Sequence, residues 1–120
     1  YPRRNAGAAM TTTLAVLIEP KQAEITQAIQ YTVITSIAVI DKITVTNTGA
    51  ATATISINIP TNLGSVAASN LIVNARSLDV GESYTCPEMV GHVLKTGDYI
   101  STIASVAGTL TIRASGREIV

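Results

Sequence analysis

Polar and apolar residues alternate most clearly between Ala51 and Ile59. The odd positions of this run are Ala or Ile, whereas the even positions are Thr, Ser or Asn. A period of two places one set of side chains on a single face of a β-strand, and a helix would scatter them around its surface. The run before it, residues 38–47, is also rich in β-branched residues, and Asn47-Thr48-Gly49 separates the two. Asn and Gly tolerate positive φ, so the pattern predicts a β-hairpin over residues 38–59.

The first arm of this predicted hairpin contains one irregularity. Asp41-Lys42 interrupts the apolar positions, so that Ile40, Ile43 and Val45 cannot share one face with a strict period of two. An extra residue absorbed between Ile40 and Ile43 restores the pattern. The sequence therefore predicts a β-bulge at this point.

Further strand candidates recur at short intervals, with turn residues between them. They are residues 13–18, 29–33, 71–78, 83–86, 99–105 and 109–114. The last two flank Ala107-Gly108 and are predicted to form a second hairpin. About seven or eight short strands with regular turns are typical of two packed sheets. We therefore predict an all-β fold, a single antiparallel β-sandwich that is jelly-roll-like, with an extended N-terminal arm.

The first candidate strand differs from the others because Leu14-Ala-Val-Leu-Ile18 is continuously apolar. Such a run needs cover on both faces. Pro20 is predicted to end the strand, since proline cannot donate to a ladder. For residues 20–29 a short helix is the alternative to extended structure, because Gln and Ala favour it.

Residues 1–20 are predicted to form the arm, and residues 21–120 the sandwich domain. The first nine residues contain Pro, Gly, Asn and two Arg without periodicity, so a neighbour is expected to order them. One sandwich covers one face of residues 14–18, and we expect this segment to add to an exposed strand edge of a neighbouring subunit. The predicted interface residues are Arg3, Arg4, Leu14, Val16, Leu17 and Ile18.

The composition indicates one domain that associates with other chains. At 120 residues the chain can build a core without a metal or disulfide. It is 47% hydrophobic and 13% charged, against about 25% charged residues in an average domain. With few charges to cover its surface, part of that surface is expected to be buried against other subunits.

The charge balance argues against nucleic-acid and membrane partners. The formal net charge is +0 and aromatic residues make up 3% of the chain, so neither a basic footprint nor stacking platforms are expected. Arg3 and Arg4 would release too few counterions to bind a polyanion tightly. No apolar run approaches the roughly 20 residues of a membrane span.

The chemistry-bearing residues do not form a recognisable site. Cys86 and His92 are the single cysteine and the single histidine, so a catalytic Cys-His or Ser-His-Asp set would need His92, which no nucleophile-elbow pattern accompanies. The carboxylates lack calcium-loop spacing. We predict a protein that is not an enzyme and has no cofactor, metal or small-molecule substrate. Paired carboxylates for glycoside hydrolysis stay open, because their separation in space is invisible in a sequence.

Three tyrosines offer another alternative. Tyr31, Tyr84 and Tyr99 could form a sugar-binding platform if the fold brought them together. The chain has no Trp, the residue with the largest aromatic face. We therefore expect these tyrosines to serve as sheet and core residues.

Six segments recur in a characteristic order along residues 28–120. They are Gln30-Tyr-Thr-Val33, residues 38–47, the alternating arm to Ile59, Leu78-Asp-Val-Gly-Glu82, residues 93–100 and residues 110–119. In this order they resemble small virion structural proteins of tailed bacteriophages. The resemblance implies a non-enzymatic β-sandwich subunit that cements or decorates a capsid, or attaches near the neck and tail. The segment before Ala28 departs from the pattern, which leaves the mode of attachment open.

From this resemblance we predict a bacteriophage virion structural protein, specifically a capsid cement or decoration protein that binds across capsid subunits. Its partners would be the major capsid protein or other virion subunits, and it would be a homo-oligomer, for which a trimer suits the threefold positions of a shell. It would be made in the host cytoplasm and reside in the virion, at the capsid surface or at the neck and tail. The alternatives are a neck- or tail-associated structural protein and a β-sandwich module that binds a receptor or glycans through its loops.

Overall fold

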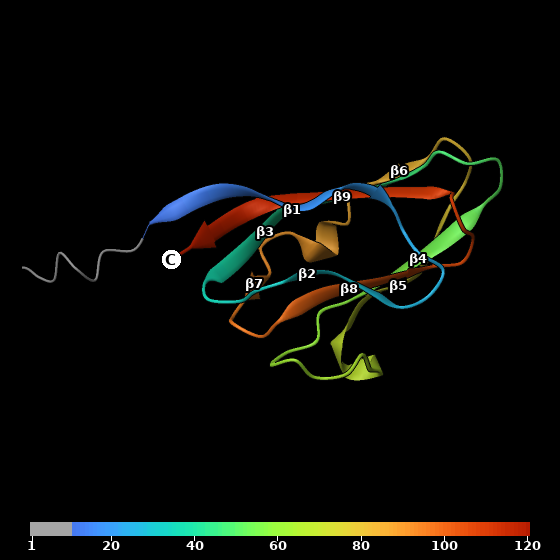
Figure 1. The fold of residues 1–120 in the computed structure, drawn as a ribbon. Coiled ribbons are helices and arrows are strands. Elements are labelled where there is room, and N and C mark those ends of the chain that lie inside the picture. Colours follow the sequence, from blue (N-terminus) through green and yellow to red (C-terminus); the bar gives the residue numbers. More distant parts are fainter. Residues whose placement is uncertain (1–10) are drawn as a thin grey trace, which may run out of the picture.

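A computed structural model describes residues 11–120 and shows two antiparallel sheets packed face to face (Figure 1). The strands are β1 (Thr12–Gln22), β2 (Ala28–Thr32), β3 (Ile37–Asn47), β4 (Ala53–Asn58), β5 (Leu71–Leu78), β6 (Ser83–Tyr84), β7 (Val93–Leu94), β8 (Tyr99–Ala104) and β9 (Leu110–Ile119). Two 3-10 turns, η2 (Ala68–Asn70) and η3 (Pro87–Met89), lie between strands. Within residues 11–120, no helix is long and apolar enough to cross a membrane.

The strand order is that of a jelly roll. Sheet A has five strands in the order β1-β9-β3-β6, with β7 also paired to β3, and sheet B has four in the order β2-β8-β4-β5. The chain passes from one sheet to the other at every connection except those between β4 and β5 and between β6 and β7. This alternation gives two facing Greek-key sheets. The predicted all-β sandwich is confirmed.

Both predicted hairpins are wrong, although their strands exist. β3 belongs to sheet A and β4 to sheet B, and β8 and β9 are divided in the same way. The alternation in β4 does bury Ala53, Ile55 and Ile57. A period of two shows only that one face meets the core, and it fits a strand in the facing sheet as well as a hairpin partner. The segment Asn47-Thr48-Gly49 is therefore a corner between the sheets.

Asn47 fixes this corner from inside. Its side chain is buried and its Nδ2 donates to the carbonyl oxygens of Ala51, at 2.8 Å, and Leu78, at 3.0 Å. Its Oδ1 accepts a bond of 3.0 Å from the backbone N–H of Gly49. Burying an amide costs little free energy when its hydrogen-bond partners are present. These bonds hold the end of β3, the turn after it and the end of β5 in one arrangement.

The predicted bulge in β3 is present. The register of β3 against β9 shifts between Ile40 and Lys42, so Asp41 is the extra residue. As expected, Ile40, Ile43 and Val45 are all buried.

Strand β1 does not end at Pro20. It continues to Gln22, and its register against β9 shifts between Ile18 and Lys21. Pro20 is exposed at this irregularity, where a missing N–H breaks no regular ladder. The alternative helix over residues 20–29 is not formed, and this stretch holds the end of β1 and the start of β2.

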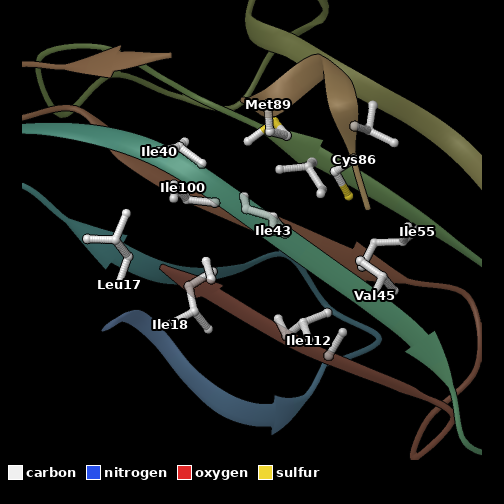
Figure 2. Packing of buried hydrophobic residues seen from close by; sticks show 14 of the residues in the cluster. Leu17, Ile18, Ile40, Ile43, Val45, Ile55, Cys86, Met89, Ile100 and Ile112 are labelled. Atoms are coloured by element: carbon white, nitrogen blue, oxygen red, sulfur yellow. The ribbon is translucent and has the colours of Figure 1, made fainter. Parts of the chain in front are cut away.

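The core lies between the sheets and is built mainly of isoleucine, leucine and valine (Figure 2). Sheet A contributes Ile40, Ile43 and Ile112, and sheet B contributes Ile55 and Ile100, all of them at most 1% exposed. Each such side chain stabilises the fold by about 1.5–3 kcal/mol relative to leaving it in water.

Candidate functional site

The first half of β1 forms the outer edge of sheet A. β1 pairs with β9 on one side, and no other described strand lies beside it in the sheet. From Thr12 to Val16 its register against β9 is unbroken. This stretch, residues 12–16, is called the 12–16 edge below. It lies beside the end of β9 that carries the C-terminus (Figure 1).

The backbone of the 12–16 edge presents donors and acceptors away from the sheet. Thr11 and Val120 exchange two backbone bonds, of 2.9 and 3.0 Å. In an antiparallel pair such bonded positions recur every second residue, so Thr13 and Ala15 also face β9. The N–H and C=O groups of Thr12, Leu14 and Val16 therefore point to the free side. They form a ready template for another strand.

The side chains at this edge are uncharged, and its two large apolar side chains are exposed. Leu14 is 82% exposed and Val16 is 52% exposed. Both line a shallow hollow of about 330 Å³ on the outer surface, together with Ala15, Asp41, Ser115 and Gly116. Residues 11–18 contain no charged side chain. The edge therefore offers backbone groups and apolar side chains in the same place.

An ion pair borders this hollow. The bulge turns Asp41 toward Arg117 on β9, where Nη2 donates to Asp41 Oδ1 at 2.8 Å and Nε donates to Oδ2 at 3.1 Å. The bonds to Asp41 raise the pKa of the Arg117 guanidinium, so it stays charged. Both side chains remain about 40% exposed, at 42% and 41%. A two-bond pair with fixed geometry gives the rim of the hollow a defined shape.

The other strand edges are short or irregular. β6 and β7 have two residues each. β2 has five residues and a register shift between Ile29 and Tyr31. β5 carries Arg76 and has Ala75 at φ 47°, with register shifts opposite it in β4. These are the devices that keep sheet edges from pairing. The 12–16 edge is also five residues long, but its register is unbroken and it carries no charge.

The predicted interface residues separate into three groups. Leu14 and Val16 are exposed at the edge, where an interface residue must be. Leu17 and Ile18 are 5% and 2% exposed and belong to the core of their own sandwich, so their assignment to an interface is corrected. The register shift between Val16 and Ile18 explains the difference, because it lets two consecutive side chains point inward. Arg3 and Arg4 lie outside the described residues.

The predicted domain boundary is corrected in the same way. The arm is predicted over residues 1–20, but residues 12–20 lie in β1, which pairs with β9 of the same chain. The inward face of β1, with Leu17 and Ile18, is covered by the core between the sheets, whereas Leu14 and Val16 are left to solvent. The sandwich therefore begins at or before Thr12.

The remaining candidate residues are placed as follows. Cys86 is fully buried, and burial raises the pKa of its thiol to about 12, so the nucleophilic thiolate is disfavoured. His92 is half-buried, between η3 and β7. Among the described residues, no three His, Cys, Asp or Glu side chains gather as a metal site would require.

The three tyrosines within residues 11–120 each have a separate acceptor. Tyr31 donates to Glu118, Tyr84 to Glu88, and Tyr99 to the carbonyl oxygen of Gly64. Tyr84 and Tyr99 are buried. These are the sheet and core roles expected from the sequence.

Sequence reasoning missed the pairing of Asp41 with Arg117 and the close contact at Gly116. An added Cβ at Gly116 would lie 2.1 Å from the carbonyl oxygen of Val39, inside the sheet. The predicted bulge is a sequence signal for the Asp41–Arg117 pair, since a bulged residue is turned away from its own strand. A single glycine within a strand is a signal for the close contact at Gly116.

Comparison with known proteins gives little beyond this geometry. No family model and no curated protein matches the sequence. Among solved structures, a chain from the structure of infectious bursal disease virus, Gx strain, superposes on 93% of this chain with a TM-score of 0.47 and 10% identity. This chain spans 31% of the length of that chain. A likeness at this level identifies neither the fold nor the function.

Proposed function

We propose that this chain is a structural subunit of a virion and that it assembles through the 12–16 edge of β1. The observation that carries the proposal is an uncharged edge strand on which Leu14 is 82% exposed and Val16 is 52% exposed. Long apolar edges of this kind are otherwise blocked in monomeric proteins. The virion setting comes from the resemblance of residues 28–120 to tailed-bacteriophage structural proteins.

The finer role is that of a capsid cement or decoration protein. Such a protein needs a rigid body and an edge that adds to another subunit. The jelly roll supplies the body, and the partner's backbone would pair with Thr12, Leu14 and Val16. The Asp41–Arg117 pair at the rim would fix the orientation of the incoming strand.

The contact is expected to be modest for each copy. Burying Leu14 and Val16 contributes about 1.5–3 kcal/mol each at most, and each new backbone hydrogen bond a net of about 0.5–1.5 kcal/mol. Association costs several kcal/mol in lost freedom. Many weak contacts on one shell would nevertheless give firm attachment, because each bound copy raises the effective concentration of the next.

The test is binding to empty capsids of the chain's own phage, assembled without it. Leu14→Lys places a charge on the edge and is expected to weaken attachment about tenfold or more, measured by cosedimentation. Ile29→Lys is the matched control, because Ile29 is 59% exposed on β2 of the other sheet. It should bind as the wild type does.

Two results would count against the proposal. If wild-type chain does not bind these capsids but binds a defined glycan on an array, the glycan-binding alternative holds instead. If Leu14→Lys and Ile29→Lys attach equally well, the 12–16 edge is not the surface used.

A further inference from the structure

We infer that the strand added to the 12–16 edge is β1 of a second copy, paired antiparallel about a twofold axis at Leu14. The inference rests on the proposed function, since it names the subunit that pairs with the same edge. Pairing of the two edges holds two copies together, and Leu14→Lys then weakens capsid attachment by separating the copies, which lowers the number of linked contacts with the shell. Its support is the register of β1, the lack of charge along it, and the shape of the other edges of sheet A.

The register fits a twofold axis at Leu14. That axis places Leu14 opposite Leu14 of the second copy, and Thr12 opposite Val16. Each of these residues has its N–H and C=O directed to the free side, as the bonded pair of Thr11 and Val120 requires. Bonded pairs in an antiparallel ladder recur every second residue, so all three positions pair at once. About six new backbone bonds result, two for each pair.

The side chains also suit a second copy. Leu14 would pack directly against its own equivalent, and Val16 would pack beside Thr12. Cross-strand apolar pairs stabilise a sheet, and like charges placed opposite one another destabilise it. Because residues 11–18 carry no charge, pairing two copies brings no like charges together. A charged partner strand, in contrast, would find no counter-charge on the 12–16 edge itself.

The assembly formed by this pairing is complete with two copies, because no free β1 edge is left for a third. The pairing would join the two copies of sheet A into one continuous sheet that ends at β6 and β7, beside β3, on either side. β6 and β7 have two residues each and give little backbone for further addition. A twofold contact uses the same patch on both chains and leaves none for a third. The structure therefore favours a dimer at this edge over a fibre.

Single cysteines test the partner and the register together. The native Cys86 is fully buried, so each introduced thiol is the reactive one. In Leu14→Cys the two Cα atoms would be about 5.5 Å apart, within the range for a disulfide. Mild oxidation of the native-state chain should therefore convert Leu14→Cys mostly to a covalent dimer of twice 12.5 kDa.

Matched variants give the control. Thr12→Cys alone should crosslink at least tenfold less, because the two Thr12 positions would be about 13 Å apart along the strands. Thr12→Cys mixed with Val16→Cys should give the mixed disulfide, since these residues face each other. Sedimentation of the unmodified wild-type chain should show a dimer, and Leu14→Lys should sediment as a monomer.

Two outcomes would overturn the inference. Leu14→Cys that stays monomeric on oxidation shows that β1 does not meet a second β1, and equal crosslinking of Thr12→Cys and Leu14→Cys shows that the register is wrong. If either outcome is found while Leu14→Lys still loses capsid binding, the proposed function stands with another partner at the edge. A crosslinked dimer that binds no capsid would instead keep the pairing and remove the virion role.

Discussion

Gly116 lies where the backbones of three strands come close together in sheet A. It sits on β9 opposite Ala15 of β1 and Ile40 of β3. A Cβ added there would meet the carbonyl oxygen of Val39 at 2.1 Å and the Leu17 side chain at 2.9 Å. The Leu17 side chain could shift, but the contact with the Val39 backbone cannot be relieved without moving a strand.

Gly116→Ala is therefore expected to lower the free energy of unfolding by about 2 kcal/mol or more. Urea unfolding followed by circular dichroism measures this. Gly81→Ala is the control, because Gly81 has φ 82° but no atom near its missing Cβ, and it should cost about 1–2 kcal/mol from backbone strain alone. A Gly116→Ala chain as stable as the wild type would show that the strands are less closely packed than described.

Two residues beside η3 make the stability of the fold sensitive to alkaline pH. Burial raises the pKa of Cys86 from 9.0 to about 12. Burial, and then the hydrogen bond to Glu88, raises the pKa of Tyr84 from 10.0 to about 12. Both groups hold their protons more tightly in the folded chain than in the unfolded one.

Their contribution to stability is present below about pH 9 and is lost as the pH rises toward 12, because the unfolded chain then releases protons that the folded chain retains. The urea midpoint should therefore fall between about pH 8 and pH 11. Cys86→Ala should reduce this fall, although its cavity lowers stability at every pH. Equal wild-type midpoints at the two pH values would contradict the buried state of both groups.

Among the elements, β1 has two halves with different roles. Leu17 and Ile18 fill the core, whereas Leu14 and Val16 face solvent. A chain that begins at Lys21 would lack both core residues and leave β9 paired with β3 on one side only. We expect this truncated chain to lose its cooperative thermal transition.

Point variants separate the two halves. Ile18→Ala should cost about 2–4 kcal/mol, and Leu14→Ala less than about 0.5 kcal/mol, since it lies at the surface. Thermal melts followed by circular dichroism compare all three chains. A truncated chain with the melting temperature of the wild type would mean that β1 is dispensable, as an exchanged arm would be.

The sequence predicted the strands better than their partners. Alternation identified β4 and the bulge in β3, because burial on one face leaves a period of two. It could not tell a hairpin from a crossing between sheets, since Ile55 meets the same core in either case. The alternation also could not show which residues of Leu14-Ala-Val-Leu-Ile18 are exposed and which are buried. That division follows from the register shift after Val16, which depends on pairing with β9. Two of the predicted interface residues therefore lie at the edge, and two lie in the core.

At the scale of the whole molecule, the proposed association uses one edge of sheet A. The low charge of the chain, 13%, predicts a surface buried against other subunits but does not say where. The proposal places that surface at β1, which has no charge or proline before Ile18, whereas β6 and β7 at the other edge have two residues each. Attachment would extend sheet A in one direction.

Amide hydrogen exchange, read residue by residue in the monomer obtained by dilution and in the assembled chain, tests this association most directly. In the monomer Thr13 and Ala15 should exchange slowly, because they pair with β9, and Leu14 and Val16 should exchange fast. Assembly should slow Leu14 and Val16 at least tenfold and leave Thr13 and Ala15 nearly unchanged. Unaltered exchange at Leu14 and Val16 on assembly would show that the 12–16 edge takes no part in it.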